Sequence, residues 1–269
     1  MLQRILPCVF RILLLGVAAL ATSSASGETQ TLRVLTYNIH YGQGNDGAYD
    51  LERLARVIVE AKPDLVALQE VDVMVERSGR VHQAQQLGKL TGLSVRYGPT
   101  QHYQGGLYGN AVLSRFPIDD VHIQPLPYTD ATADLQTYPR GAISVVVQTP
   151  SGKPLRFIST HFQHNLAEDR TKQADAINEY FAEDKLPTVL AGDINAVPDS
   201  EPLRILQSRW TNAIDAARSP TAPSHQPTSR IDYVFYRGDG LKLIESRVID
   251  EPMASDHCPV LVVLEWNDR

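Results

Sequence analysis

The sequence predicts a single domain of mixed α and β structure. Short runs rich in β-forming residues occur along the chain, and some are separated by segments with the apolar spacing of a helix. Pro and Gly stand at nearly every joint, and the chain shows no internal repeat, low-complexity stretch or long linker. The roughly 240 residues that follow a leader segment are enough for one large domain with a substantial core.

The leader segment comprises residues 1–27. Arg4 and Arg11 provide a basic start, residues 12–21 form an apolar run, and small residues follow up to Gly27. This order is typical of a secretory signal peptide, and the apolar run is shorter than the roughly 20 residues that a spanning helix needs. We therefore expect an exported protein, periplasmic or secreted, whose residues 28–269 form one domain without a transmembrane segment. The alternative is that residues 1–27 remain as an N-terminal anchor.

Helices are expected at three places. Asp50 can cap a helix over residues 51–61, where apolar side chains repeat at the spacing of one helix face, and Pro63 marks the end of that helix. Two further helices are expected around residues 82–90 and 167–181.

Strands are expected wherever a short run of β-forming residues is bounded by turn formers. Some of these runs are wholly apolar, which suits strands that are buried on both faces. The expected strands are 32–37, 65–68, 111–113, 143–147, 155–159, 188–191, 231–236, 241–248 and 260–266. These residues indicate mixed α and β content but not the order of the strands in a sheet.

Reactive side chains recur where these apolar runs end. A single polar residue after a strand means little, because loops are polar. Repetition at many strand ends is harder to dismiss, since a sheet delivers such residues to a shared rim. The residues are Asn38, His40, Glu70, His161, Asp193, Asn195, Asp232, Asp256 and His257.

Seven short blocks around these residues occur in a fixed order. They are T-Y-N-I-H at 36–40, L-Q-E-V at 68–71, G-N-A-V-L-S-R at 109–115, S-T-H at 159–161, G-D-I-N at 192–195, R-I-D-Y at 230–233 and S-D-H at 255–257. Together they resemble the signature blocks of the endonuclease/exonuclease/phosphatase superfamily. That superfamily includes deoxyribonuclease-I-like enzymes, abasic-site endonucleases, neutral sphingomyelinases and inositol polyphosphate 5-phosphatases. Each block alone is a weak signal, but the resemblance extends from about Leu32 to Trp266.

The resemblance implies an α/β four-layer sandwich, in which two packed mixed β-sheets are flanked by helices and the site lies at one rim. It also implies a phosphoric ester hydrolase, in which water attacks a phosphodiester or phosphomonoester in line with the help of Mg2+ or Mn2+. The residue types suit this chemistry, because phosphoryl transfer depends mainly on positioning and on neutralising charge on the non-bridging oxygens. We expect a monomer.

The resemblance further implies a role for each polar residue at the rim. Glu70 is expected to be the principal metal ligand, with Asn38 beside it and Asp256 able to approach the metal. Asp193 is expected to be the general base that orients or deprotonates the attacking water. Asn195 would hold a phosphate oxygen and the water in line.

Two histidines and two further side chains complete the expected site. His257 would contact the scissile phosphate and stay charged through Asp232, because a neighbouring acid raises the pKa of a histidine. His161 is a second candidate for a phosphate contact. Asn110 matches a position that in relatives helps to set up the second histidine, and Arg140 could clamp a substrate phosphate with its planar guanidinium.

Each of these residues also has an ordinary interpretation when it is taken alone. Glu70 would be a solvated loop acid, Asp193 and Asn195 would form a turn, and Arg140 would be exposed on a loop. His40 departs from the pattern, because some superfamily nucleases carry an acid there that helps to hold the metal. Imidazole is a poorer partner than carboxylate for Mg2+, so a two-carboxylate metal site at this end is in doubt and a preference for Mn2+ is allowed.

The substrate is less constrained than the chemistry. The net charge of -6 becomes -8 when residues 1–25 are removed, because they contain two arginines and no acid. Strong sequence-independent binding to nucleic acid relies on Lys and Arg, so the acidic balance disfavours DNA or RNA without excluding a nuclease. The resemblance to small exported family members, which are often phosphodiesterases of lipid headgroups, favours a lipid headgroup or small phosphodiester. Basic and aromatic residues between positions 77 and 108 could track a nucleic acid strand, but a helix followed by an exposed loop is the simpler interpretation. Within that loop, Gly105–Gly109 could be a mobile wall of the cleft.

A catalytically inactive binding module on the same fold is the alternative from another class of protein. Such a module would be expected to lose a metal ligand, the base or a phosphate-contacting histidine. This chain keeps Glu70, Asp193, Asn195, Asp232 and His257, which argues against that alternative.

Overall fold

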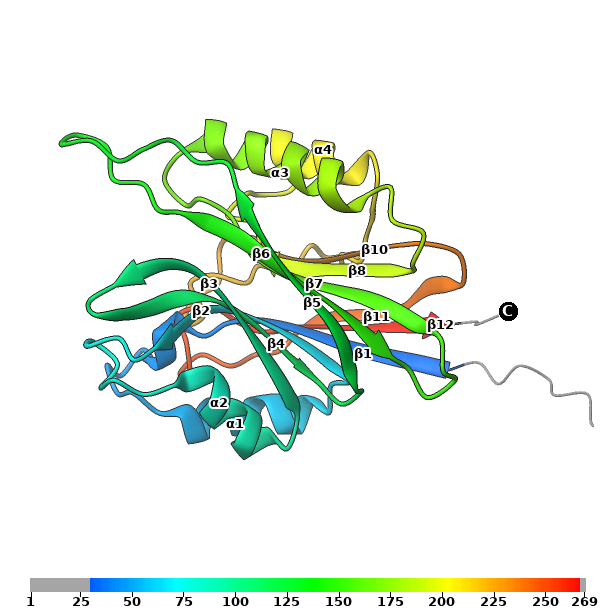
Figure 1. The fold of residues 1–269 in the computed structure, drawn as a ribbon, viewed down its shortest axis with the longest axis horizontal. Coiled ribbons are helices and arrows are strands. Elements are labelled where there is room, and N and C mark those ends of the chain that lie inside the picture. The colour runs from blue at the N-terminus through cyan, green and yellow to red at the C-terminus, as the bar shows by residue number, and fades with distance from the viewer. Residues whose placement is uncertain (1–29, 267–269) are drawn as a thin grey trace, which may run out of the picture.

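The computed structural model of the protein describes residues 30–266, so the predicted signal peptide lies outside the described residues. These residues form four layers, in which two six-stranded mixed sheets pack face to face and each carries two α-helices on its outer side (Figure 1). The expected four-layer sandwich is confirmed. Within residues 30–266, none of the helices has the length and apolar character needed to cross a membrane.

The first sheet has the strand order β11-β12-β1-β2-β4-β3, and only β1 and β2 pair in parallel. Its strands are β1 (Gln30–Asn38), β2 (Leu65–Val73), β3 (Ser94–Tyr103), β4 (Gly106–Ser114), β11 (Leu241–Val248) and β12 (Val260–Trp266). Helices α1 (Leu51–Ala61) and α2 (Gln83–Thr91) cover its outer face, and a short 3-10 turn, η1 (His40–Gly42), follows β1.

The second sheet has the order β5-β6-β7-β8-β10-β9, and only β7 and β8 pair in parallel. Its strands are β5 (Ile118–Leu126), β6 (Arg140–Gln148), β7 (Pro154–His161), β8 (Thr188–Asp193), β9 (Thr211–Asn212) and β10 (Asp232–Arg237). Helices α3 (Ala167–Phe181) and α4 (Glu201–Gln207) lie on its outer face. The whole second sheet is therefore one continuous segment inserted between β4 and β11.

Local sequence explains where α1 begins and ends. The Asp50 carboxylate accepts a hydrogen bond of 2.8 Å from the backbone N–H of Arg53, which satisfies a donor that the first helical turn leaves free. Lys62 follows in the left-handed conformation, with φ of 49°, and Pro63 comes next. The predicted boundaries 51–61 are confirmed, as are those of α3 at 167–181.

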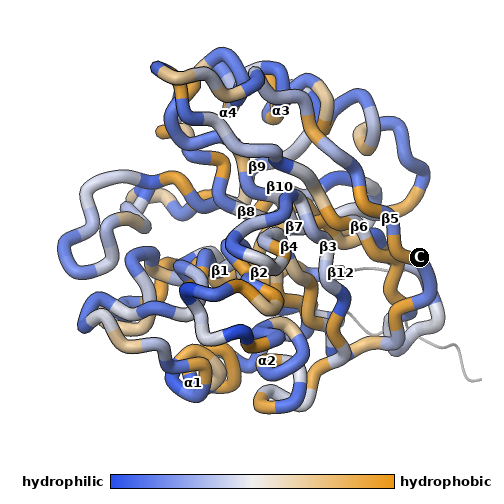
Figure 2. The backbone as a smooth tube through the Cα atoms, turned by 60° about the vertical axis from the view of Figure 1, so that its left-hand side comes forward, coloured by the Kyte–Doolittle hydropathy of each residue, from blue (hydrophilic) through white to orange (hydrophobic). Residues whose placement is uncertain are grey.

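The space between the two sheets is filled by a branched and aromatic core. Val34, Val112 and Val262 from the first sheet meet Ile143 and Phe157 from the second, and all five are fully buried. Burying such a side chain stabilises the fold by roughly 1.5–3 kcal/mol. In Figure 2 hydrophobic residues concentrate in the strands between the helix layers, whereas much of the surrounding loop structure is hydrophilic. This packing fixes the spacing between the sheets.

Five elements were not anticipated from the sequence, namely β3, β5, α4, the two-residue β9 and the 3-10 turn η1, and one interpretation was wrong. Residues 94–103 form β3 rather than an exposed loop, and Gly106 to Gly109 belong to β4, so that Gln104 and Gly105, with φ of 43° and 76°, turn the chain. Both β3 and β5 are edge strands. The side chains of β5 are mostly exposed and those of β3 are mostly half-buried, so neither strand has the apolar pattern of a buried strand. Helix α4 has only seven residues, too few for a clear apolar period.

Candidate functional site

The strand directions bring the expected site residues to one rim of the sandwich. Because β1 and β2 are parallel, Asn38 and Glu70 lie at the same edge of the first sheet. Because β7 and β8 are parallel, His161 and Asp193 are paired at the corresponding edge of the second sheet. Strand β10 is antiparallel to β8 and starts at that edge, where Asp232 is the register partner of Asp193. Residues far apart in the sequence therefore meet at one end of the fold.

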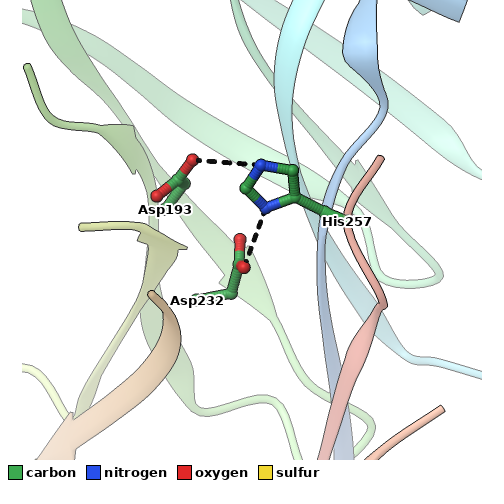
Figure 3. A group of neighbouring side chains, drawn as sticks. All are labelled: Asp193, Asp232 and His257. Atoms are coloured by element: carbon green, nitrogen blue, oxygen red, sulfur yellow. Dashed lines mark hydrogen bonds and ion pairs between the residues drawn. The ribbon is translucent and has the colours of Figure 1, made fainter. Parts of the chain in front are cut away.

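Side chains from the two sheets join across the gap between them. His257 precedes β12 of the first sheet, and its Nδ1 lies 2.9 Å from Oδ2 of Asp232 on the second sheet (Figure 3). Its Nε2 lies 3.8 Å from Oδ2 of Asp193. From the first sheet, Asn38 Nδ2 donates to Oε1 of Glu70 and to Oδ2 of Asp193, both at 3.1 Å. The site therefore forms only when the two sheets are correctly packed against each other.

A break in the β2 ladder directs Glu70 toward the site. The pairing of β2 with β4 shifts between Leu68 and Val71, and Glu70 lies in that shift with φ of 58°. Such a bulge re-aims a side chain, and a positive φ costs a residue other than glycine on the order of 1–2 kcal/mol. Asn195 has a similar φ of 51° directly after β8. Strain of this kind is characteristic of functional sites.

His257 is held in its charged form. Burial alone would lower its pKa, but the Asp232 carboxylate, helped by its hydrogen bond, and the nearby Asp193 and Asp256 raise the pKa well above its ordinary value. The predicted charge-keeping role of Asp232 therefore has the required geometry. The imidazolium can stabilise negative charge that develops on a phosphate.

His161 is held in the opposite state. Burial lowers its pKa well below the ordinary value, and the cationic Arg140 lowers it further. Arg140 Nη1 lies 3.1 Å from His161 Nδ1, and because a guanidinium can only donate, Nδ1 is the acceptor and the ring proton is on Nε2. That Nε2 lies 3.4 Å from Oδ2 of Asp193, to which its proton is directed. Nδ2 of Asn195 lies 3.0 Å from the same ring nitrogen, but both groups are donors in this tautomer, and Nδ2 donates instead to the Phe162 carbonyl at 3.0 Å. His161 is thus a neutral donor aimed at the centre of the site.

Asp193 occupies that centre. Its Oδ1 accepts from the backbone N–H of Asn195 at 2.8 Å, while Oδ2 faces Asn38 and both histidines. Burial and the neighbouring Asp232 raise its pKa to about 7. A carboxylate with a pKa close to neutral is suited to accept a proton from water at physiological pH.

Arg140 was interpreted from the sequence as equally compatible with an exposed loop, and the structure excludes that interpretation. It opens β6, is only 5% exposed, and makes no ion pair with any residue of the described range. Its Nη1 contacts His161 and, at 3.4 Å, the Tyr108 hydroxyl, whereas its buried Nε has no hydrogen-bond partner among residues 30–266. A buried cation without a counter-ion is costly, so this guanidinium is prepared for an anion.

Two other expected residues lie around this centre. Asn110 is buried, and its amide donates at 2.9 Å to the carbonyl of Gly141, next to Arg140 on β6, so a direct substrate contact by Asn110 stays a prediction. Asp256 is more exposed, with Oδ1 4.0 Å from Nε2 of His257 and Oδ2 3.8 Å from Nε2 of His40. Its metal contact also stays a prediction.

Some contributors to the site were missed. Arg230 is 3% exposed, its Nε donates at 2.8 Å to the Asp232 carbonyl, and its Nη1 pairs with Asp215 at 2.9 Å. It therefore fixes the start of β10. Its position in the R-I-D-Y block was the available signal. Beneath the site, the Gln69 amide donates at 3.3 Å to the Ser159 hydroxyl, which ties the two sheets together.

A cavity of about 300 Å³ opens at this rim. Its lining is polar and aromatic throughout, and no lining residue in the described part of the chain is aliphatic. The lining residues are Glu70, Arg77, Gln101, Tyr103, Tyr108, Tyr138, Arg140, His161, His164, Asp193, Asn195 and His257. Its size suits a small ligand or one part of a larger ligand.

The oxygen donors at this rim fit a hard divalent cation. Within residues 30–266, ligand atoms of Asp193, Asp232 and His257 lie within 4.8 Å of one another, but the protonated His257 ring has no free lone pair, so only the two carboxylates of this group are candidate ligands. Oδ1 of Asp232 is buried without a hydrogen-bond partner in the described structure, and a cation or an ordered water would satisfy it. Glu70, beside Asn38, adds a carboxylate that lines the cavity. Carboxylate and amide oxygens are the ligands that Mg2+ prefers.

Comparison with known proteins agrees with this geometry. The sequence model of the Endonuclease/Exonuclease/phosphatase family matches residues 35–257. The chain belongs to this family. Its members are generally phosphoric ester hydrolases, and the family and fold implied by the seven blocks are confirmed.

The sequence identity between the chain and individual known proteins is low. The uncharacterized protein YbhP of Escherichia coli K12 is 27% identical over 222 residues, which are 77% of this chain and 85% of YbhP. A crystal structure of an endonuclease/exonuclease/phosphatase from Beutenbergia cavernae superposes with a TM-score of 0.69 at 26% identity, over 88% of this chain and 72% of the other. The mannosyl-6-phosphatase Bt3783 of Bacteroides thetaiotaomicron superposes with a TM-score of 0.66 at 20% identity, over 87% of this chain and 99% of the other. That identity shows a shared fold alone.

Proposed function

We propose that the protein is an exported, divalent-metal-dependent phosphodiesterase that hydrolyses a small phosphodiester or a lipid headgroup ester. The observation that carries this proposal is the buried, unpaired Arg140, which lies in the same cavity as the charged His257 and the neutral donor His161. Two cations and a neutral N–H donor around one carboxylate provide a receptor for a phosphate group.

Each residue has a definite task in this reaction. Arg140, His161 and the Asn195 amide hold the non-bridging oxygens, and the His257 cation balances charge that builds up on phosphorus-bound oxygen. Asp193 Oδ2 accepts the proton of the attacking water, which Asn195 helps to keep in line with the scissile bond. Attack forms a new P–O bond and breaks the bond to the leaving alcohol.

A divalent cation would be held by Glu70, with Asp256 approaching from its exposed side. Asn38 directs its Nδ2 at Glu70 and Asp193 and its Oδ1 at the His40 N–H, so it would add an oxygen ligand only after its amide turns. His257 is a poor ligand, because its Nδ1 is bonded to Asp232 and the ring stays protonated. The bound cation would neutralise negative charge on the phosphate. The oxygen donors suit Mg2+, and His40, 3.8 Å from Asp256, leaves Mn2+ as the alternative.

A small substrate is favoured over nucleic acid on two grounds. The cavity of about 300 Å³ accommodates a headgroup rather than several nucleotides, and the chain carries a net charge of -6. A nuclease would need an extended basic surface beside this cavity.

The inactive binding module is the less favoured alternative. Arg140, Asp193 and His257 are all present and converge on one cavity, whereas an inactive scaffold has no need of a buried unpaired cation. Export and a monomeric state remain part of the proposal, on the basis of residues 1–27 and of the family resemblance.

The direct test is hydrolysis of bis-4-nitrophenyl phosphate by residues 28–269, with Mg2+, with Mn2+ and with EDTA. We expect turnover that EDTA abolishes and that Asp193→Asn lowers by about 10²–10⁴-fold, the usual contribution of a general base. Glu70→Gln should weaken metal binding measured by calorimetry as well as turnover.

Arg96→Gln is the matched control, because Arg96 is exposed on β3 and its guanidinium contacts only a neighbouring carbonyl. Turnover that persists in EDTA would contradict the proposed metal dependence. If neither the wild type nor Asp193→Asn hydrolyses the substrate, and metal binding does not depend on Glu70, the inactive module would be favoured.

A further inference from the structure

Arg77 lines the cavity from the first sheet, in the loop that follows β2. Its Nε and Nη2 donate to the two oxygens of Asp72 at 2.9 and 3.0 Å. Asp72 is fully buried, so this side-on ion pair is anchored inside the protein. The pair fixes the plane of the guanidinium.

Aromatic rings hold the same guanidinium from its faces. Its carbon lies 3.7 Å from the ring centre of Tyr41, 4.7 Å from that of Tyr103 and 5.5 Å from that of Tyr108. Contacts of a guanidinium with aromatic faces are attractive and restrict its movement. Arg77 is therefore already ordered before any ligand binds.

A further side chain fixes the partners of Arg77. The Gln83 amide donates to the Tyr41 carbonyl at 2.6 Å, and its oxygen accepts from the backbone N–H of Asp72 at 2.9 Å. Tyr41 is held in a positive-φ conformation, with φ of 43°. This arrangement holds the turn after β1 and the loop after β2 against each other, at the cost of a strained backbone.

One edge of the guanidinium remains available. Nη1 of Arg77 makes no hydrogen bond or ion pair with any residue in the range 30–266, and the side chain is 22% exposed. The cavity that it borders also contains Gln101 and the rings of Tyr103 and Tyr108. A rigid donor edge beside aromatic faces is thus presented to whatever fills this part of the cavity.

We propose that Arg77 is a specificity-determining residue that binds a hydroxylated ring, a sugar or a cyclitol, esterified to the phosphate held by Arg140. This inference rests on the proposed phosphodiesterase function and adds the class of its substrate. Nη1 donates to ring hydroxyl oxygens, Gln101 exchanges hydrogen bonds with others, and Tyr103 and Tyr108 pack against the C–H faces of the ring.

The contrast with Arg140 favours a hydroxylated ring over a second anionic group. Arg140 has no counter-ion, so it requires an anion, whereas the charge of Arg77 is already balanced by Asp72. A balanced guanidinium offers hydrogen-bond donors without a large net attraction for anions. The absence of aliphatic side chains among the described lining residues also disfavours a hydrocarbon group at this position.

The test compares diesters that share one leaving group. The probes are 4-nitrophenyl myo-inositol 1-phosphate, 4-nitrophenyl glucose 6-phosphate and methyl 4-nitrophenyl phosphate, which lacks a ring. We expect the wild type to prefer at least one ring diester over the methyl diester in kcat/KM. Arg77→Gln should reduce that preference by on the order of 10- to 100-fold, the effect of losing a hydrogen bond from a charged donor. The preferred ring diester identifies a sugar or a cyclitol.

Arg80→Gln is the control, because Arg80 lies in the same loop, is 54% exposed and pairs only with the exposed Glu76. It should leave the preference unchanged. Arg77→Lys provides a second variant if Arg77→Gln unfolds, since lysine keeps the charge but cannot pair side-on with Asp72. Equal losses on ring and methyl diesters would overturn the proposal, because they would show that Arg77 only supports the fold or the phosphate.

A binding measurement separates this inference from the proposed function. Calorimetry with myo-inositol 1-phosphate, glucose 6-phosphate and methyl phosphate needs no turnover. If the wild type hydrolyses none of the diesters, the proposed function fails, yet tighter binding of a ring phosphate that Arg77→Gln abolishes would still support the assignment of Arg77. Equal binding of ring and methyl phosphates would overturn it.

Discussion

The two histidines of the site face the same oxygen of Asp193 from opposite directions and are held in opposite charge states. His257 approaches from the first sheet and has Asp232 at its other ring nitrogen, so its pKa is raised despite burial. His161 approaches from the second sheet and has Arg140 at its other nitrogen, so burial and that cation lower its pKa.

Asp232 therefore keeps His257 charged, whereas burial, supported by Arg140, keeps His161 neutral. Two residues of the same type therefore provide the site with a cation, His257, and a neutral hydrogen-bond donor, His161. Groups whose pKa values are pushed apart by their surroundings can take different tasks in one reaction. The following predictions test this division of labour, from the largest expected effect to the smallest.

The first prediction compares His257→Gln with His161→Gln. Loss of a cation that stabilises the transition state should lower kcat by about 10²–10³-fold. Loss of a neutral donor should cost only about 10-fold, because a single neutral hydrogen bond contributes modestly. Steady-state kinetics on bis-4-nitrophenyl phosphate measures both, and equal losses would show that the two rings do the same work.

The second prediction concerns Arg140→Met, which keeps much of the side-chain volume but removes the charge next to His161. We expect KM to rise by on the order of 10-fold, because a charge-assisted contact with the phosphate is lost. The His161 pKa should also rise, although burial will keep it below its ordinary value. Kinetics and NMR titration of the ring report the two effects. An unchanged His161 pKa would mean that burial alone sets its charge.

The third prediction is a displacement of the pH profile in Asp232→Asn. Activity requires Asp193 deprotonated and His257 protonated, so the rate should rise as pH passes through about 7 and fall when His257 loses its proton. Asp232 raises the pKa of both groups, so its neutralisation should move both limbs to lower pH. The profile is measured at constant metal concentration. A shift of either limb to higher pH would contradict the assignment of charges.

Short-range sequence patterns were sufficient to predict much of this molecule. The Asp50 cap and apolar spacing located α1 at its observed boundaries, and residues after buried strands converged at the rim as expected. These features depend on a few neighbouring residues, so they can be recognised without knowledge of the fold. The order of the blocks then indicated the family.

Features that depend on contacts distant in sequence could not be predicted. The buried state of Arg140 arises because β6, β7 and β4 enclose it, and Y-P-R-G alone does not distinguish this from an exposed loop. Likewise, Arg77 was grouped with surface basic residues, because its partner Asp72 lies in a wholly buried strand segment and Tyr41 comes from another loop. The edge strand β3 was missed because its polar pattern resembles a loop.

The connection of the chain has a consequence for how this activity would be lost. The segment from β5 to β10 forms the second sheet, and the segments on either side of it form the first. Asp193 and Asp232 therefore belong to the second sheet, whereas the first sheet and its loops provide His257, Asn38 and Glu70. Within residues 30–266 the chain passes from one sheet to the other only twice, between β4 and β5 and between β10 and β11. The proposed catalytic activity would then depend directly on the distance between the two sheets. A small displacement of one sheet relative to the other, far from the rim and too small to unfold either sheet, would abolish the proposed activity before the protein unfolds.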